Sequence, residues 1–514
     1  MLPKQKKSRP SAFTEIGFRA TIDQLVEEIQ TLYLADEVPW IIGYSGGKDS
    51  SAVLQLVWLA LAGLAPEERR KPVQVISTDT LVENPVVAAW VTQSLARMRE
   101  CAAAAGLPIH PNRLTPAVAD SFWVNLIGRG YPAPRHKFRW CTERLKIKPS
   151  NTFITTVVHE RGEAILVLGT RKAESAARAR SMVRLEARRV RERLSPNAAL
   201  PNCLVYSPIE DWSNDDVWLF LMQVENPWGH NNKDLLTMYQ GASPDGECPL
   251  VVDTTTPSCG DSRFGCWVCT LVDQDKSMKA MIQNDEEKEW MMPLLKLRNE
   301  LDEPDDRAKR DFRRMTGLVQ LFHDQPIPGP YTQKVREDWL RKLLTVQEAI
   351  RRHQQSPEDV RNLELINLNE LREIRRIWIV EKHELEDRLP QIYREVTDRH
   401  YPDERLDESG VFGADELAVL EDICGEDRLR YELVRELLDI EQRYRTAARR
   451  AGLFDAIEKA FGRGFYDSEQ DAVARALQQR TALERARRGG SAEEDMRGLV
   501  ALIEVGNEEH AGEE

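Results

Sequence analysis

The residues with the clearest chemical potential form the run SGGKDS at positions 45–50, between a short apolar stretch and a longer one. Glycines let a backbone approach phosphate oxygens without a clash from a Cβ atom. A loop that opens a helix offers free N–H groups and the positive end of the helix dipole to an anion. The spacing is not that of a Walker A loop. We predict a different nucleotide-phosphate loop, with an ordinary strand-to-helix turn as the alternative. Its residues are Ser45, Gly46, Gly47, Lys48, Asp49 and Ser50.

A second group of residues could hold a metal. Cys266 and Cys269 are separated by two residues, which lets both thiolates reach one metal centre. Cys259 and Cys248 precede them, and Cys141 lies further upstream. Zinc and iron–sulfur clusters both use such ligands, and the spacing alone does not choose between them; scattered structural thiols are the alternative. The other cysteines are expected to pack in the core: Cys101, Cys203 and Cys424.

Two segments are rich in positive charge. Residues 171–193 contain nine basic side chains against three acidic ones. A local basic groove can bind a phosphodiester backbone even when the whole chain is acidic. The alternative is a solvated, charged helix. The second set surrounds Cys141: Arg135, Lys137, Arg139, Arg144, Lys146 and Lys148.

These residues are expected on an α/β scaffold. Short apolar runs at 38–44, 73–79, 108–114 and 164–169 predict strands. Helical patterns at 12–36, 52–65 and 86–105 alternate with them. Such alternation predicts a doubly wound, mostly parallel sheet.

The chain is expected to contain four parts. They are an N-terminal helical segment (1–36), a nucleotide domain (37–225), a cysteine-rich segment (226–285) and a C-terminal all-α region (286–514). Within the last part, residues 333–355, 361–395, 414–450 and 467–505 are charged, poor in glycine and favourable for helices.

Composition and charge limit the classes of protein to which this chain can belong. The 514 residues carry 71 basic and 84 acidic side chains, a formal net charge of −13, which argues against a surface wholly coated for nucleic acid. The longest apolar run, 52–65, is too short to cross a bilayer, and the basic N-terminus lacks the apolar segment of a secretory signal. We therefore expect a cytoplasmic protein without membrane partners, whose eight cysteines are not disulfides.

In this context SGGKDS resembles the loop of the PP-loop ATP pyrophosphatases, which cleave ATP between the α and β phosphates. Residues 169–178 (GTRKAESAAR) resemble the G-x-R-x-x-x-S-x-x-R segment of the sulfur-handling branch, which includes adenylyl-sulfate reductases. The resemblance implies an adenine nucleotide α-hydrolase-like fold, ATP with Mg²⁺, and catalytic roles for Lys48, Asp49, Arg171 and Arg178. Beyond the loop, it implies nucleotide contacts from Asp79, Gly169, Arg171 and Ser175. A helix N-cap is the alternative for Asp79, and a solvated helix face is the alternative for Arg171 and Arg178.

Two cysteine segments extend the resemblance. Residues 139–149 (RWCTERLKIKP) and 265–270 (GCWVCT) are similar to the segments that together hold a [4Fe–4S] cluster in those reductases. This chain has Thr142 where the reductases have the second cysteine of a pair, so a fourth ligand must come from elsewhere. The implied ligands are Cys141, Cys259, Cys266 and Cys269, with Cys248 in reserve for Cys259 and zinc as the alternative metal.

The chain departs from the reductases at its C-terminal end. It lacks their terminal C-G-[IL]-H segment, since Cys424 is followed by Gly425 and then by a long helical stretch. Simple reduction of a sulfate nucleotide is therefore disfavoured. The combination resembles the DndC family of DNA phosphorothioation sulfurtransferases and the related SspD. The similar stretches are 44–51, 137–149, 169–178 and 258–278, with the charged character of 370–394.

That resemblance implies that sulfur replaces a non-bridging oxygen of the DNA backbone, in support of antiviral defence. A DNA phosphate oxygen would attack the α-phosphate of ATP, and Lys48, Arg171, Arg178 and Mg²⁺ would offset the repulsion between the anions. Sulfur from a cysteine desulfurase, relayed through the cluster, would then displace AMP. The expected partners are DNA, the desulfurase and other phosphorothioation subunits. The alternatives are a tRNA base thiolase, a reductase-like enzyme for adenylyl sulfate or phosphoadenylyl sulfate, and a non-catalytic, nucleotide-gated DNA-binding subunit.

Overall fold

The computed structural model describes residues 11–243, 265–402, 414–445 and 450–487. The chain divides into two compact units, which are considered separately below. The first, the sheet unit, comprises Met1–Phe122, Pro134–Leu301 and Ile350–Leu363. The second, the helical unit, comprises Trp123–Ala133, Asp302–Ala349 and Glu364–Glu514.

The sheet unit is built on six strands in the order β3-β2-β1-β4-β6-β5, and only the short β5 runs antiparallel to its neighbour. The predicted doubly wound, mostly parallel sheet is confirmed. Because β1 pairs with β2 on one side and with β4 on the other, the chain reverses its direction of winding beside β1. Ligands of such sheets bind in the crevice outside the carboxyl ends of the strands at this point. The strands are β1 (Trp40–Gly43), β2 (Val73–Thr78), β3 (Ile109–Leu114), β4 (Ala164–Val167), β5 (Ser195–Pro196) and β6 (Cys203–Tyr206).

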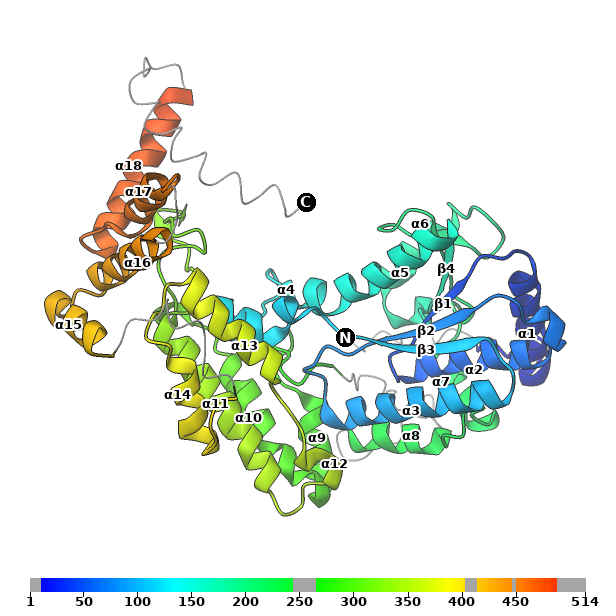
Figure 1. Cartoon of the computed structure of the whole chain (residues 1–514). Helices are drawn as coiled ribbons and strands as arrows, with labels where there is room; N and C mark the ends of the chain where they lie inside the picture. The colour runs from blue at the N-terminus through cyan, green and yellow to red at the C-terminus, as the bar shows by residue number, and fades with distance from the viewer. Residues whose placement is uncertain (1–10, 244–264, 403–413, 446–449, 488–514) are drawn as a thin grey trace, which may run out of the picture. The chain divides into compact units, whose positions relative to one another are not determined.

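Helices cover both faces of this sheet (Figure 1). Alternate residues of β1 point to opposite faces, so Trp40 and Ile42 join one apolar core while Ile41 joins the other. The larger core lies under α1 (Phe18–Leu34), α2 (Lys48–Ala62), α3 (Pro85–Ala104), α7 (Asn214–Gln223) and α8 (Asn232–Gly241). The smaller core lies under α5 (Lys148–Arg161). The unit also contains α4 (Trp140–Thr142), α6 (Ala176–Glu186), α9 (Lys276–Asn284), α10 (Met292–Leu301) and α12 (Glu358–Arg361).

The first turn of α2 touches the turn that follows β4, backbone against backbone. A Cβ atom on Gly169 would lie 2.8 Å from the carbonyl oxygen of Asp49 and 3.1 Å from the amide nitrogen of Ser50. No side chain fits in that space, so glycine is required at position 169. The contact sets the distance between the loop after β1 and the residues after β4.

The helical unit has its own apolar core, which confirms the predicted C-terminal all-α region. Leu340 and Leu344 are buried with Ile374 and Leu389. Trp378 donates a hydrogen bond from its indole nitrogen to the carbonyl oxygen of Ile127 at 3.0 Å, so a segment from much earlier in the chain belongs to this core. The helices are α11 (Gln333–Arg352), α13 (Leu368–Arg376), α14 (Arg388–Thr397), α15 (Ala414–Cys424), α16 (Arg428–Arg445), α17 (Leu453–Gly464) and α18 (Glu469–Arg487), with a small hairpin of β7 (Leu321–Phe322) and β8 (Gln325–Pro326).

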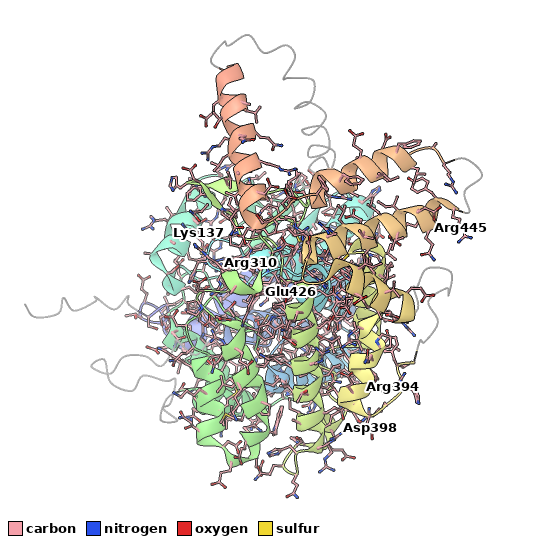
Figure 2. The ribbon with its side chains drawn as sticks, turned by 90° about the vertical axis from the view of Figure 1, so that its left-hand side faces the viewer. Lys137, Arg310, Arg394, Asp398, Glu426 and Arg445 are labelled. Atoms are coloured by element: carbon pink, nitrogen blue, oxygen red, sulfur yellow. The ribbon has the colours of Figure 1, made fainter. Side chains whose placement is uncertain are left out.

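Charged side chains cover the outer faces of these helices. Arg394, Asp398, Glu426 and Arg445 are exposed examples (Figure 2). Among the described residues, no helix combines the length and the apolar character that a membrane span needs.

A substitution at Gly169 tests the backbone contact. We expect Gly169→Ala to lower the free energy of unfolding by about 1–3 kcal/mol, because overpacking at a rigid backbone contact has no flexible side chain to absorb it. Gly241→Ala is the matched control, since a Cβ there meets nothing within 4 Å. Urea unfolding of both variants is the measurement, and equal stability of the two would contradict the predicted constraint.

Candidate functional site

A cavity of about 450 Å³ opens at the carboxyl ends of β1, β2 and β4, where the sheet reverses its winding. One part of its wall is apolar and includes Ile76, Ile154 and Leu168, while another part carries hydroxyl and amide groups. An apolar surface with a few convergent polar groups suits a nucleoside. The polar lining residues are Ser45, Ser77, Thr78, Ser150, Asn151 and Asn197.

The SGGKDS loop forms the edge of this cavity through Ser45. Gly46 has a φ of +73°, and a Cβ there would lie 2.5 Å from the side chain of Val91, so this position also requires glycine. The loop is held by its own hydroxyl groups. The amide of Ser45 donates to the Oγ of Ser50 at 3.2 Å, and that hydroxyl donates to the carbonyl oxygen of Gly47 at 3.0 Å. Helix α2 starts at Gly47 without a side-chain cap, which leaves an N-terminus suited to an anion.

Two cations and one carboxylate meet at this helix start. Lys48 is buried, with its Nζ 3.2 Å from Asp49 Oδ2. Arg171 is only 4% exposed; its Nε lies 2.6 Å from Asp49 Oδ1, and its Nη1 donates to the carbonyl oxygen of Trp212 at 3.2 Å. Asp49 therefore orients both cations, and the cluster keeps a net positive charge beside the helix N-terminus. This arrangement favours binding of nucleotide phosphates.

Three other residues predicted to belong to the site have local structural partners. Asp79 accepts from the amide of Leu81 at 2.9 Å and pairs with Arg113, whereas the N-cap of α3 is Asn84. Ser175 caps α6 by accepting from the amide of Arg178 at 3.1 Å. The Arg178 guanidinium lies 3.5 Å from Glu174 and is about half exposed. Their predicted roles toward the nucleotide stay predictions.

Sequence reasoning missed several cavity residues. Thr78 and Ser150 face each other with their hydroxyl oxygens 3.0 Å apart, and Asn197 also lines the cavity. Glu83 also lines the cavity; burial raises the pKa of its carboxyl to about 7, although the charge of Lys146 opposes the shift. Serine, threonine and asparagine are common at strand and helix ends. The only available signal was therefore their position at the end of β2, just after β5 or at the start of α5.

Cys266 adjoins the cavity wall through its bridge with Glu83, and Cys266 and Cys269 both lie close enough to act on the thiol of Cys141. The Cys266–Cys269 turn closes with a 3.0 Å hydrogen bond from the Cys269 amide to the Cys266 carbonyl oxygen. The turn is held against the loop after β2, because Cys266 pairs with Glu83 as an antiparallel bridge. Burial, followed by the proximity of Cys266 and then Cys269, raises the pKa of the Cys141 thiol to about 11. Burial likewise raises the pKa of Cys266.

The donor chemistry of these thiols fits a soft metal or an iron–sulfur centre. A metal offsets the cost of burying thiolates, and a two-residue turn is a usual ligand spacing. Within the described residues, however, no three histidine, cysteine or acidic side chains are arranged to hold a metal ion. Cys248 and Cys259, the candidates for the fourth ligand, lie outside the described residues.

The basic segment 171–193 is largely engaged in ion pairs with distant acids. Arg189 lies 2.9 Å from Glu210, and Arg191 lies 2.7 Å from Asp36. Lys172 and Arg193 also pair with acidic side chains. Three exposed arginines, spaced four residues apart along and just beyond α6, have no partner among the described interactions: Arg180, Arg184 and Arg188.

The basic residues around Cys141 also include both side chains paired with an acid and an exposed side chain. Arg144 and Lys148 both pair with Asp120, at 2.9 and 2.6 Å. Lys137 is exposed on a tight turn between Arg135 and Phe138 (Figure 2). The cations available to a polymer are therefore fewer than the sequence suggested.

Comparison with known proteins agrees with this geometry. Residues 39–230 match the phosphoadenosine phosphosulfate reductase domain, and residues 415–462 match a small protein found in certain Dnd DNA modification systems. These matches support the PP-loop superfamily and an enzyme that uses nucleotides in sulfur chemistry. An uncharacterized protein of Methanocaldococcus jannaschii is 24% identical over 251 residues, which are 49% of this chain and 40% of that relative. The aligned region thus spans well under half of the relative's length.

Two solved structures are also similar. The phosphoadenylyl-sulfate reductase of Candida auris in its phosphate complex is 14% identical, covering 40% of this chain and 86% of that one with a TM-score of 0.25. The U34-tRNA thiolase NcsA of Methanococcus maripaludis with its [4Fe–4S] cluster is 12% identical, covering 59% and 88% with a TM-score of 0.27. At these scores the two structures do not bear on function.

Arg171 offers a test of the charge cluster. We expect Arg171→Met to lower the free energy of unfolding by up to about 3 kcal/mol, because Asp49 loses its buried partner. The double variant Asp49→Asn with Arg171→Met should recover part of that stability without recovering ATP cleavage.

Arg178→Met is the matched control for this experiment. Its exposed pair with Glu174 should change stability by less than about 0.5 kcal/mol. A loss of ATP cleavage in this variant at unchanged stability would support the predicted catalytic role of Arg178. Wild-type ATP cleavage by Arg171→Met would refute the role given to the cluster.

Proposed function

We propose that this chain is an ATP-dependent sulfurtransferase that activates a DNA backbone phosphate and exchanges one of its non-bridging oxygens for sulfur. The observation that carries the proposal is the position of the thiols. Glu83 lines the nucleotide cavity and also pairs with Cys266, so the sulfur chemistry and the nucleotide share one wall. The match of residues 415–462 to a small protein of Dnd DNA modification systems supports DNA as the substrate.

In the first step, ATP would occupy the cavity with its phosphates at the start of α2. A non-bridging oxygen of DNA attacks the α-phosphorus, the bond to the bridging oxygen of the β-phosphate breaks, and pyrophosphate leaves. Lys48 and Arg171 would stabilise the added negative charge, because their contacts with Asp49 hold them beside the start of α2 before the reaction. Mg²⁺ carried by the phosphates would neutralise further charge.

In the second step, a nucleophile at the oxidation level of sulfide attacks the activated DNA phosphorus. The bond between that phosphorus and the activated oxygen breaks, and AMP leaves with the oxygen. A cysteine desulfurase is the proposed source of the sulfur, which it delivers as a persulfide. Two electrons from a dithiol reductant, also supplied in the test reaction, cleave the persulfide to sulfide and a thiol, and the reductant becomes a disulfide. Cys141, Cys266 and Cys269 would hold a [4Fe–4S] cluster together with a ligand from outside the described residues, and such a cluster supplies iron that can bind sulfide.

The function is tested with the complete chain, ATP, DNA, a cysteine desulfurase and a dithiol reductant. We expect AMP and pyrophosphate in equal amounts, and sulfur in a dinucleotide linkage after nuclease digestion and mass spectrometry. Lys48→Met should abolish both products. Cys266→Ser should abolish sulfur incorporation and lower bound iron while ATP binding is kept. Sulfur found in a tRNA base instead would identify a base thiolase and refute the proposal.

The exposed arginines of α6 are the proposed contacts to the DNA backbone. We expect the triple variant of Arg180, Arg184 and Arg188 to alanine to bind DNA more weakly. Its slope of log affinity against log salt should also be shallower by about 2–3, because each lost phosphate contact removes roughly 0.7–0.9.

A control variant with the same change in charge replaces Arg19, Arg161 and Lys233, which are exposed elsewhere on the sheet unit. Fluorescence anisotropy over a salt series measures both variants. Equal slopes in the two variants would exclude α6 from the DNA interface.

A further inference from the structure

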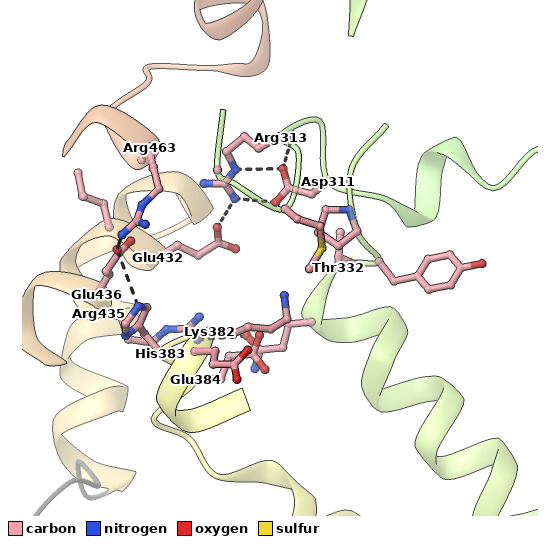
Figure 3. Close-up of a pocket in the computed structure, with 18 of the residues that line it drawn as sticks. Asp311, Arg313, Thr332, Lys382, His383, Glu384, Glu432, Arg435, Glu436 and Arg463 are labelled. Carbon is pink, nitrogen blue, oxygen red and sulfur yellow. Dashed lines mark hydrogen bonds and ion pairs between the residues drawn. The ribbon is translucent and has the colours of Figure 1, made fainter. Parts of the chain in front are cut away.

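The helical unit contains a second cavity, of about 230 Å³, that the proposed function does not use. Its walls come from the segment around Asp311–Arg314, the start of α11, residues 381–384, and helices α16 and α17 (Figure 3). Its lining is dense in charge of both signs. The balance between those charges indicates what the cavity can bind.

Every carboxylate of the lining is matched by an arginine. Arg313 lies 2.7 Å from Asp311 and 2.7 Å from Glu432, and Arg463 lies 2.5 Å from Glu436 (Figure 3). The remaining two acids pair in the same manner, Glu384 with Arg336 and Glu381 with Arg376. Asp311 and Glu432 share Arg313, but Glu432 also lies 3.0 Å from Arg428, so five arginines match the five carboxylates. The negative charge of the cavity is therefore already neutralised.

Two cations of the lining lack a carboxylate partner within the described part of the chain. Arg314 donates to the carbonyl oxygen of Pro328 at 3.0 Å, and its pKa is lowered by burial and by Arg310. Lys382 has no hydrogen bond or ion pair among those described, and its ammonium group points into the cavity (Figure 3). Burial, with the charge of Arg336, lowers the pKa of Lys382 from 10.5 to about 8. The carboxylates of Glu384, Asp311 and Glu381 oppose this shift without forming an ion pair with Lys382 among those described. A buried ammonium group that makes no hydrogen bond costs free energy, and a bound anion that accepts from it would offset that cost.

The size and the lining restrict the anion. The volume is below the roughly 300 Å³ at which pockets for whole organic ligands begin, so a small ion is favoured over a nucleotide. The carboxylates that act on Lys382 line the same cavity, and their oxygens can accept a hydrogen bond. Hydrogen phosphate carries a proton that it can donate to them. Sulfate and a DNA phosphodiester carry none at neutral pH, and the same carboxylates would repel them.

We propose that this cavity is a binding site for inorganic phosphate. Lys382 and Arg314 would bind the anion, and the surrounding carboxylates would accept a hydrogen bond from it. Glu432 and Glu436 lie within residues 415–462, the segment that matches the small Dnd-system protein. Bound phosphate would therefore tie this segment to the preceding part of the helical unit.

Calorimetric titration of the complete chain with sodium phosphate, without ATP or DNA, tests the proposal independently of the sulfur chemistry. We expect phosphate to bind at least about 10-fold more tightly than sulfate at matched ionic strength. Lys382→Met should weaken phosphate binding roughly 10- to 100-fold, the effect of losing a hydrogen bond to a charged group. Lys382→Arg should keep most of the affinity, and Lys334→Met, at an exposed lysine of α11, should keep all of it.

Thermal unfolding separates binding from a merely structural role. Without phosphate, Lys382→Met should unfold at a higher temperature than the wild type, because a desolvated charge is removed. Phosphate should raise the midpoint of the wild type and not that of the variant.

Amine labelling at pH 8 gives a readout that needs no variant. Lys382 should react faster than Lys334, because more of its amine is unprotonated, and phosphate should slow only Lys382.

Three results would overturn the proposal. They are equal phosphate affinity of Lys382→Met and wild type, equal affinity for sulfate and phosphate, and labelling of Lys382 that phosphate leaves unchanged. Displacement of phosphate by a DNA oligonucleotide without terminal phosphates would also overturn it, since it would assign the cavity to the DNA backbone.

Discussion

The nucleotide site depends on one backbone contact, the approach of Gly169 to the first turn of α2. Because a Cβ on Gly169 would lie 2.8 Å from the Asp49 carbonyl oxygen, the two turns meet with no side chain between them. Arg171 follows two residues later and reaches Asp49 at 2.6 Å. The same contact therefore brings the loop after β1, the turn after β4 and the paired charges to one place. The winding of the sheet forms the crevice, and this contact positions the charged residues that favour phosphate binding there.

The second constraint is the shared wall between nucleotide and thiols. Glu83 belongs to the cavity lining and to the bridge with Cys266, and the charge of Lys146 acts on both groups. A change in occupancy of the cavity is thus felt electrostatically at the thiol turn. ATP cleavage alone does not need thiols beside the nucleotide. Their proximity favours the proposed sulfur transfer, because the sulfur would reach the activated phosphate over a short distance.

Local patterns in the sequence predicted the parts of this arrangement that depend on local physics. The strands at 40–43, 73–78, 109–114 and 164–167 and the helix after SGGKDS follow from apolar runs and a glycine turn, and all were found. The grouping of Cys141 with Cys266 and Cys269 as metal ligands was implied by resemblance alone and stays a prediction, although Cys266 and Cys269 both act on the pKa of Cys141. The strands and the helix depend on neighbouring residues, so their prediction needs no knowledge of distant partners.

What the sequence could not reveal depends on residues far apart in the chain. The positive charge of 171–193 suggested a local basic groove, yet Glu210 and Asp36 pair with Arg189 and Arg191 in the folded protein. Thr78 and Ser150 become cavity residues only because α5 packs over β2. Lys382 was one lysine among many in a charged helical region, and its position in the cavity wall without a hydrogen bond or ion pair among those described exists only in three dimensions.

The segment Trp123–Ala133 belongs to the helical unit, although it lies between two stretches of the sheet unit in the sequence. Ile127 is fully buried there, and its carbonyl oxygen accepts the indole of Trp378. During synthesis this apolar segment emerges from the ribosome long before the residues that cover it. The sheet unit must therefore begin to fold before the segment Trp123–Ala133 can pack. This apolar segment stays exposed in the nascent chain until Trp378 has been synthesised. The order of synthesis therefore separates Ile127 by 251 residues from the indole that bonds to it, and the apolar segment stays exposed to aggregation for that length of translation.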